Sequence, residues 1–107
     1  MSSSDKKHSR RIMQGIEHRI PNMNNKAMVD IVGEIHEVDF ETLAETIAIM
    51  RAQYLKKVVE LARLDKSELN VNAYAEVHKL KLAFEESIES FNQLKHALER
   101  GHFKLSE

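Results

Sequence analysis

Two apolar stripes run along residues 40–64, on nearly opposite sides of one predicted helix. At about 100° per residue, the first stripe follows an a/d-type spacing that is interrupted only at Lys57. This stripe consists of Phe40, Leu43, Ile47, Met50, Tyr54, Leu61 and Leu64. The second stripe consists of Ala48, Ala52, Leu55, Val59 and Ala62. A helix that is apolar on two sides must be covered on two sides, so this segment is predicted to be a central helix.

Capping signals set the limits of this helix and of the helix that follows it. Asp39 is a favourable N-cap residue, so the first long helix is predicted over about 39–64. After a polar connection, Asn70 or Asn72 caps a second helix over about 72–100, and Gly101 ends it in the left-handed conformation. The short connection makes the two helices an antiparallel hairpin. The one apolar stripe of the second helix consists of Tyr74, Val77, Leu80, Phe84, Ile88, Phe91, Leu94 and Leu98.

Two shorter helices are expected on the N-terminal side of this hairpin. The first is predicted over about 5–19, where isoleucines recur on one face, and Pro21 with the asparagines after it is expected to end it. The second is predicted over about 25–37, with Gly33 inside it at a cost of about 1 kcal/mol relative to alanine.

The chain is predicted to form one domain of the all-α class. Residues 1–5 are expected to be a flexible tail, residues 6–101 a single helical domain, and residues 102–107 a C-terminal tail. The scarcity of glycine and proline, three and one in 107 residues, also favours helices over strands.

The second stripe of the central helix needs a cover. The second long helix covers only the first stripe, and the two short helices are too small for a helix about 40 Å long. Small side chains let two helices approach closely. We therefore expect a homodimeric bundle whose dimer seam is Ala48, Ala52, Leu55, Val59 and Ala62.

The residue types exclude several kinds of chemistry. The chain has no Cys, so it has no disulfide, thiolate metal site or Cys nucleophile. Its six histidines lack metal-ligand spacing, because Glu34 with His36 and Glu76 with His78 lie two residues apart and point away from each other on a helix. Neither a phosphate-binding glycine loop nor a rigid setting for a nucleophilic serine occurs. We expect no enzymatic activity, no metal and no cofactor.

The sequence also bears on where the protein acts. With no apolar leader or membrane span, we expect a cytoplasmic protein.

Charge is segregated along the chain. Residues 27–50 carry six acids and no cation. One reading is that helix starts favour acids and that chain tails are often basic. The other reading is an acidic patch that meets a basic partner or the chain's own basic N-terminal segment. Glu34, Glu37 and Glu45 have no local helix-terminal role, so they are the predicted partner-binding residues.

A basic segment near the N-terminus supports the alternative function. Lys6, Lys7, Arg10 and Arg11 could meet nucleic acid or an anionic membrane. No aromatic residue is interleaved for base stacking, and the sequence pI of about 6.6 argues against a dedicated nucleic-acid binder. We expect a small regulatory or adaptor protein that acts by protein–protein interaction through a helical surface, with a nucleic-acid-binding regulator as the alternative and no membrane partner.

Overall fold

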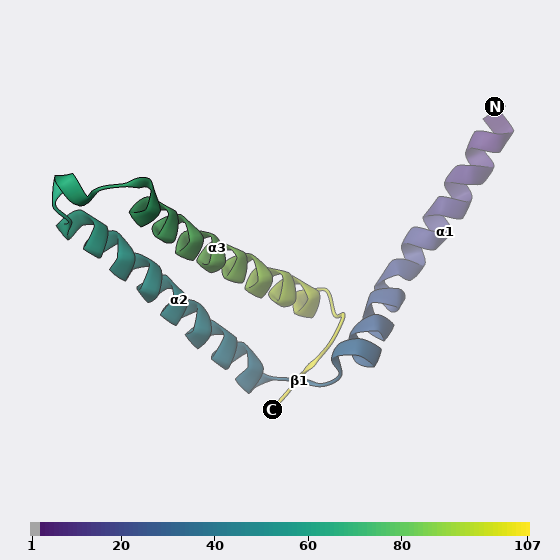
Figure 1. The fold of residues 1–107 in the computed structure, drawn as a ribbon. Coiled ribbons are helices and arrows are strands. Elements are labelled where there is room, and N and C mark those ends of the chain that lie inside the picture. Colours follow the sequence, from purple (N-terminus) through teal and green to yellow (C-terminus); the bar gives the residue numbers. More distant parts are fainter. Residues whose placement is uncertain (1–2) are drawn as a thin grey trace. The chain divides into compact units, whose positions relative to one another are not determined.

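A computed structural model describes residues 3–107, and most of them lie in three long helices (Figure 1). The prediction of an all-α fold is confirmed. The helices are α1 (Ser3–Ala27), α2 (Glu37–Arg63) and α3 (Val71–Glu99). The shorter elements are a π-helix, η1 (Met28–Val32), a 3-10 turn, η2 (Lys66–Glu68), and two strands, β1 (Ile35–His36) and β2 (Leu105–Ser106), which pair with each other.

The chain divides into two compact units. The first unit combines the chain up to Ile35 with residues 97–106, and the second is residues 36–96 with Glu107. The first unit therefore contains α1 and η1, and the second contains α2 and nearly all of α3. The single domain expected over residues 6–101 stays a prediction.

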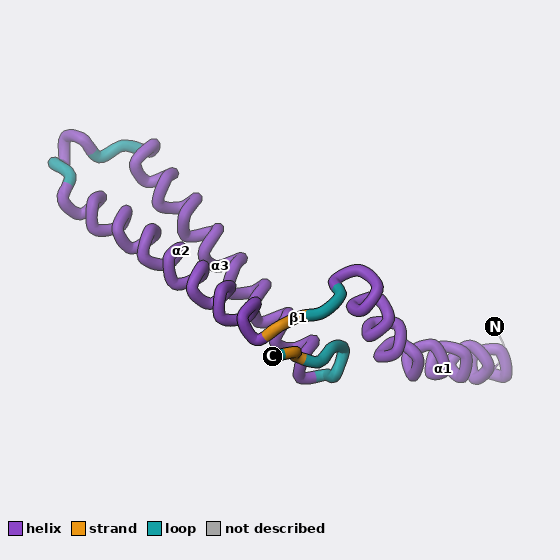
Figure 2. The backbone as a smooth tube through the Cα atoms, turned by 90° about the horizontal axis from the view of Figure 1, so that it is seen from below, coloured by secondary structure: helices purple, strands orange, loops and turns teal. Residues whose placement is uncertain are grey.

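In the second unit, α2 and α3 lie side by side and run in opposite directions (Figures 1 and 2). Near the start of α2, Phe40 meets Phe91 of α3 edge to face, with ring centroids 5.7 Å apart. Farther along α2, Tyr54 stacks on Phe84 with centroids 6.2 Å apart. The first apolar stripe of α2 is therefore the face that contacts α3.

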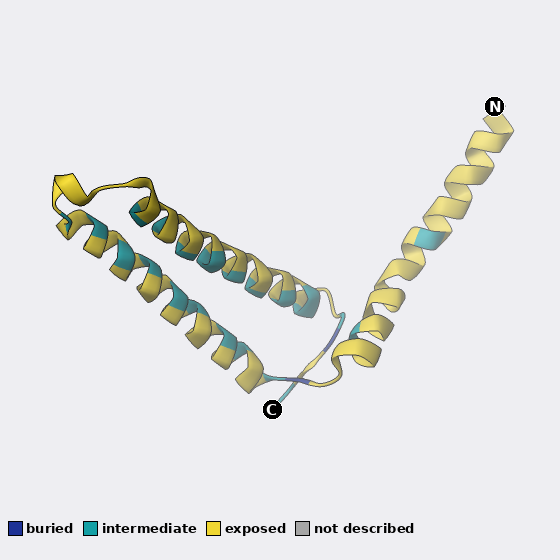
Figure 3. Cartoon of the chain, in the orientation of Figure 1, coloured by how far each residue is buried: buried dark blue, intermediate teal, exposed yellow. Residues whose placement is uncertain are grey.

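The burial pattern follows this contact (Figure 3). The half-buried residues of α2 and its C-cap are those of the first stripe together with the interrupting lysine: Phe40, Leu43, Ile47, Met50, Tyr54, Lys57, Leu61 and Leu64. On α3, Tyr74 and Ile88 were expected in the buried stripe but are exposed. Ala73 and Ser87 are half-buried instead, because both lie closer to the line that faces α2.

Lys57 bridges the two helices at the point where it interrupts the stripe. Its Nζ lies 3.2 Å from Oε2 of Glu60 on α2 and 3.6 Å from Oε2 of Glu76 on α3. The hydrogen bond and charge of Glu60, followed by the charge of Glu76, raise the pKa of Lys57 above its usual value. The lysine thus stays charged while the rest of its stripe is apolar.

Lys57→Leu is expected to raise the thermal midpoint of unfolding. The leucine would fill the interruption in the apolar stripe between Tyr54 and Leu61 and so enlarge the apolar surface that faces α3, whereas exposed ion pairs of this kind contribute little to stability. The matched control is Lys56→Leu, since the Lys56 side chain is 76% exposed against 41% for Lys57. Thermal unfolding followed by circular dichroism tests the pair. Equal midpoints for the two variants would contradict the assignment of Lys57 to the contact face.

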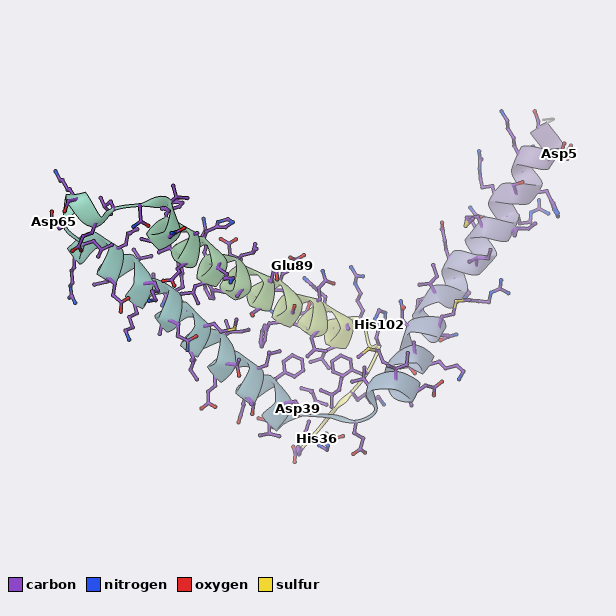
Figure 4. All side chains as sticks on the ribbon, in the orientation of Figure 1. Asp5, His36, Asp39, Asp65, Glu89 and His102 are labelled. Atoms are coloured by element: carbon purple, nitrogen blue, oxygen red, sulfur yellow. The ribbon has the colours of Figure 1, made fainter. Side chains whose placement is uncertain are left out.

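The observed capping residues of α3 agree with those predicted from the sequence, whereas the observed N-cap of α2 differs from the predicted one. Asn70 caps α3, because its Oδ1 accepts a 3.0 Å hydrogen bond from the N–H of Ala73, and Gly101 has the expected positive φ of 75°. The expected N-cap role of Asp39 is wrong. The N-cap is His36, whose N–H donates a 2.8 Å hydrogen bond to Oδ2 of Asp39 (Figure 4). An acid at the third helical position satisfies this donor from inside the helix, so α2 begins earlier than predicted.

The two short N-terminal helices were also predicted wrongly. α1 continues through Pro21 as one helix, begins within the expected tail, and passes directly into η1. Residues 1 and 2 of that tail lie outside the described residues. Proline removes only one helical hydrogen bond, and the carbonyl freed on this exposed helix is open to water. Gly33, expected inside a helix, ends η1 with a φ of 79° and donates its N–H to the carbonyl of Met28.

The most buried residues of the described chain belong to the first unit. Ile35 of β1 is 5% exposed and Phe103, just before β2, is 6% exposed. Asn25 holds the end of α1 in this unit, because its Nδ2 donates to the carbonyl of His102 at 3.1 Å. Residues 102–107 were expected only as a tail, yet they contribute a strand and half of this small core.

Candidate functional site

The outer face of α2 carries the second apolar stripe, and all of it is exposed. Leu55 is 39% exposed and Val59 is 45% exposed. The three small members, Ala48, Ala52 and Ala62, are also exposed. Because the opposite face of the same helix contacts α3, α2 has one covered apolar side and one uncovered apolar side.

The six acids of residues 27–50 have different surroundings in the structure. They are Asp30, Glu34, Glu37, Asp39, Glu41 and Glu45. Asp30 pairs with Lys26 on the preceding turn, and Asp39 accepts the hydrogen bond that begins α2. Of the predicted partner-binding residues, Glu34 belongs to the first unit, while Glu37 and Glu45 lie on α2 in the second unit. All three residues are exposed. Glu45 lies one turn before Ala48, at the edge of the uncovered stripe.

The basic residues of the alternative function share one helix. Lys6, Lys7, Arg10 and Arg11 all lie in the first turns of α1 and are exposed. Lys7 and Arg11, with Ser4 and His8, line a shallow hollow on this helix. α1 contains no Phe, Tyr or Trp, so the rings it offers for base stacking are the imidazoles of His8 and His18.

Sequence reasoning missed an apolar hollow at the end of the second unit where η2 joins α2 to α3. It is lined by Leu61, Leu69, Asn70, Val71 and Tyr74. The sequence predicts a polar connection over residues 65–72. Leu69 and Val71 are the signal in the sequence, because they are two large apolar residues within the segment predicted to be a polar connection, and Val71 is in fact the first residue of α3.

The described residues contain no evident metal centre and no membrane-spanning helix. Among residues 3–107, no three His, Asp or Glu side chains come together in an arrangement that could hold a metal ion. Within that same range, each helix is too short or too polar to cross a bilayer. Comparison with known protein families, curated proteins and solved structures finds no match to this chain.

Proposed function

We propose that this chain is a small, non-catalytic adaptor or regulatory protein of the cytoplasm that acts by protein–protein interaction. In this proposal α2 and α3 form a helical hairpin, and two copies pair through the seam Ala48, Ala52, Leu55, Val59 and Ala62. The observation that carries the proposal is the exposure of this whole seam on a helix whose other face is already in contact with α3.

The size of the side chains favours another helix as the cover of this seam. Three of its five members are alanines, which allow two helix backbones to approach closely. Leu55 and Val59 add larger apolar groups near the middle and end of the seam. Burial of apolar surface gives roughly 25 cal/mol per Å², so a seam that runs over several turns gains most from a cover that is also long and straight.

The charge along α2 favours a second copy as that cover. The charged residues in the first half of α2 are all acidic, among them Glu41 and Glu45. Basic residues begin at Arg51 and continue to Arg63. Antiparallel pairing of two α2 helices would place the acidic half of each copy beside the basic half of the other. Such pairing is electrostatically complementary and also opposes the two helix dipoles.

The partner-binding role is assigned to Glu34, Glu37 and Glu45. Complementary charge at the edge of an interface chiefly raises the rate of association. A basic partner would therefore be attracted to the acidic segment first, and apolar contacts with exposed helical residues would follow.

Reversal of Glu34, Glu37 and Glu45 to lysine is expected to slow association with that partner and to weaken its dependence on salt. Folding should change little, because single exposed charges contribute less than about 1 kcal/mol. The partner is first isolated by pull-down with the full chain from the native cell, and association is then measured by stopped flow at two salt concentrations.

The matched control is reversal of Glu85, Glu86 and Glu89, which are exposed acids of α3. It changes the net charge by the same amount and should leave the association rate close to that of the wild type. Sedimentation of both variants separates an effect on partner binding from an effect on the proposed pairing of two α2 helices, because Glu45 also lies at the edge of that seam. An association rate that the first variant does not alter would contradict the assignment of these three acids.

A further inference from the structure

α1 presents a continuous apolar stripe. Its members recur at intervals of three and four residues, so they lie on one side of the helix. They are Ile12, Met13, Ile16, Ile20 and Met23. Ile12 is 51% exposed and Met23 is 52% exposed, so both ends of the stripe are open. The short helix predicted from the sequence would have ended before Met23. The actual helix carries the stripe across Pro21 as far as Met23.

The remainder of α1 is strongly basic. The helix carries six Lys and Arg residues against Asp5 and Glu17, a net charge of +4, although the whole chain has a net charge of −1. Lys6 lies beside one edge of the apolar stripe, and Arg19 and Lys26 lie beside the other. Long basic side chains at the edges of an apolar stripe can keep their charges in water while their methylene groups lie along an apolar surface.

The apolar stripe and the basic side chains of α1 together indicate which kind of partner can bind this helix. A nucleic acid would use the cations and leave the apolar stripe uncovered. A second α1 would cover the stripe, but it would bring two helices of charge +4 together. An anionic lipid surface satisfies both faces, because acyl chains cover the stripe while acidic headgroups meet the cations. A polar helix of high cationic charge with one apolar face is the form of helices that lie in the membrane interface.

We propose that α1 is an interfacial membrane-binding helix that lies flat on an anionic lipid surface, with Ile12, Ile16, Ile20 and Met23 directed into the acyl region. Sequence reasoning expected no membrane partner, and the length and exposure of α1 are the observations that change this expectation. The proposal is independent of the dimer seam, which lies on α2.

Co-sedimentation of the full chain with lipid vesicles tests the proposal. One set of vesicles contains phosphatidylcholine alone, and the other contains equal parts of phosphatidylcholine and phosphatidylserine. Binding to the anionic vesicles is expected to be at least about tenfold tighter, since each Lys or Arg near an anionic surface contributes on the order of 1 kcal/mol. Raising the salt from about 0.1 M to 1 M shortens the screening length from about 10 Å to 3 Å and should lower binding severalfold.

Two variants separate the apolar contribution from the charge contribution. Ile16→Asn with Ile20→Asn should reduce binding to anionic vesicles about tenfold or more. Its control is Val38→Asn with Ile49→Asn, which changes two exposed apolar residues of α2. Lys6→Glu with Arg19→Glu should reduce binding to a similar extent, because these two side chains lie beside the apolar stripe. Its control, Lys66→Glu with Lys79→Glu, makes the same change of net charge outside α1. Circular dichroism verifies that each variant remains helical.

Three results would overturn the proposal. The first is binding to anionic vesicles that is no tighter than binding to neutral vesicles. The second is a loss of binding in the charge variant alone, accompanied by a mobility shift of duplex DNA by the wild type, which would assign the basic face to nucleic acid. The third is a change in the sedimentation of the lipid-free protein when Ile16 and Ile20 are replaced, which would assign the stripe to a second copy.

Discussion

Phe84→Ala and Phe91→Ala are each expected to destabilise the second unit by about 2–3 kcal/mol. Removal of a fully buried phenylalanine costs about 3–5 kcal/mol, and these two rings are half-buried, so the lower part of the range or slightly less applies. Each variant also removes a ring pair, Tyr54 with Phe84 or Phe40 with Phe91, which adds about 0.5–1.5 kcal/mol beyond burial. Chemical denaturation followed by circular dichroism measures the loss.

Tyr74→Ala is the matched control for these aromatic variants. Tyr74 lies on the same helix but is 66% exposed, so its loss should cost less than about 1 kcal/mol. Losses below about 1 kcal/mol for both phenylalanine variants would mean that this face of α3 binds a partner instead of stabilising the unit.

Ala52→Glu is expected to separate the proposed dimer into helical monomers. The substitution places a carboxylate in the middle of an apolar seam, where burial of an unpaired charge costs several kcal/mol. In a monomer the same side chain would be solvated, because Ala52 is exposed on the outer face of α2, and glutamate is a good helix former. Size-exclusion chromatography should show a smaller species with unchanged helical circular dichroism.

Ala75→Glu provides the control for that substitution. Ala75 is exposed on α3, on the side of the helix that faces away from α2. The same change of residue there should leave the oligomeric state as it is in the wild type. If Ala75→Glu and Ala52→Glu had equal effects, the seam would not be the interface.

The features predicted correctly from the sequence are those that local patterns determine. The spacing of Phe40 to Leu64 identified the face of α2 that contacts α3, including the exception at Lys57. Gly101 acts within a few residues of the helix end it stabilises, so its residue type alone was sufficient. The N-cap of α3 was narrowed to Asn70 or Asn72, and the hydrogen bond from Ala73 identifies Asn70. Asp39 was recognised as a capping residue but assigned to the wrong capping position, since an acid can act from either the N-cap or the third helical position.

The features missed from the sequence depend on contacts between distant residues. Asn25 was read as part of a turn after Pro21, whereas its side chain bonds to the carbonyl of His102, 77 residues away. The pairing of β1 with β2 joins segments separated by most of the chain, and it explains why residues 102–107 are more than a tail. Phe103 was an isolated aromatic in a polar segment, and no periodicity marked it as a core residue. Local propensity cannot predict such contacts.

Sedimentation equilibrium of the wild type over a range of concentrations tests the central claim most directly. The proposed pairing through Ala48, Ala52, Leu55, Val59 and Ala62 predicts a dimer at tens of micromolar, with Ala75→Glu also dimeric and Ala52→Glu monomeric. A wild type that sediments as a monomer at that concentration would contradict the homodimeric bundle and leave the outer face of α2 as a surface for a different protein.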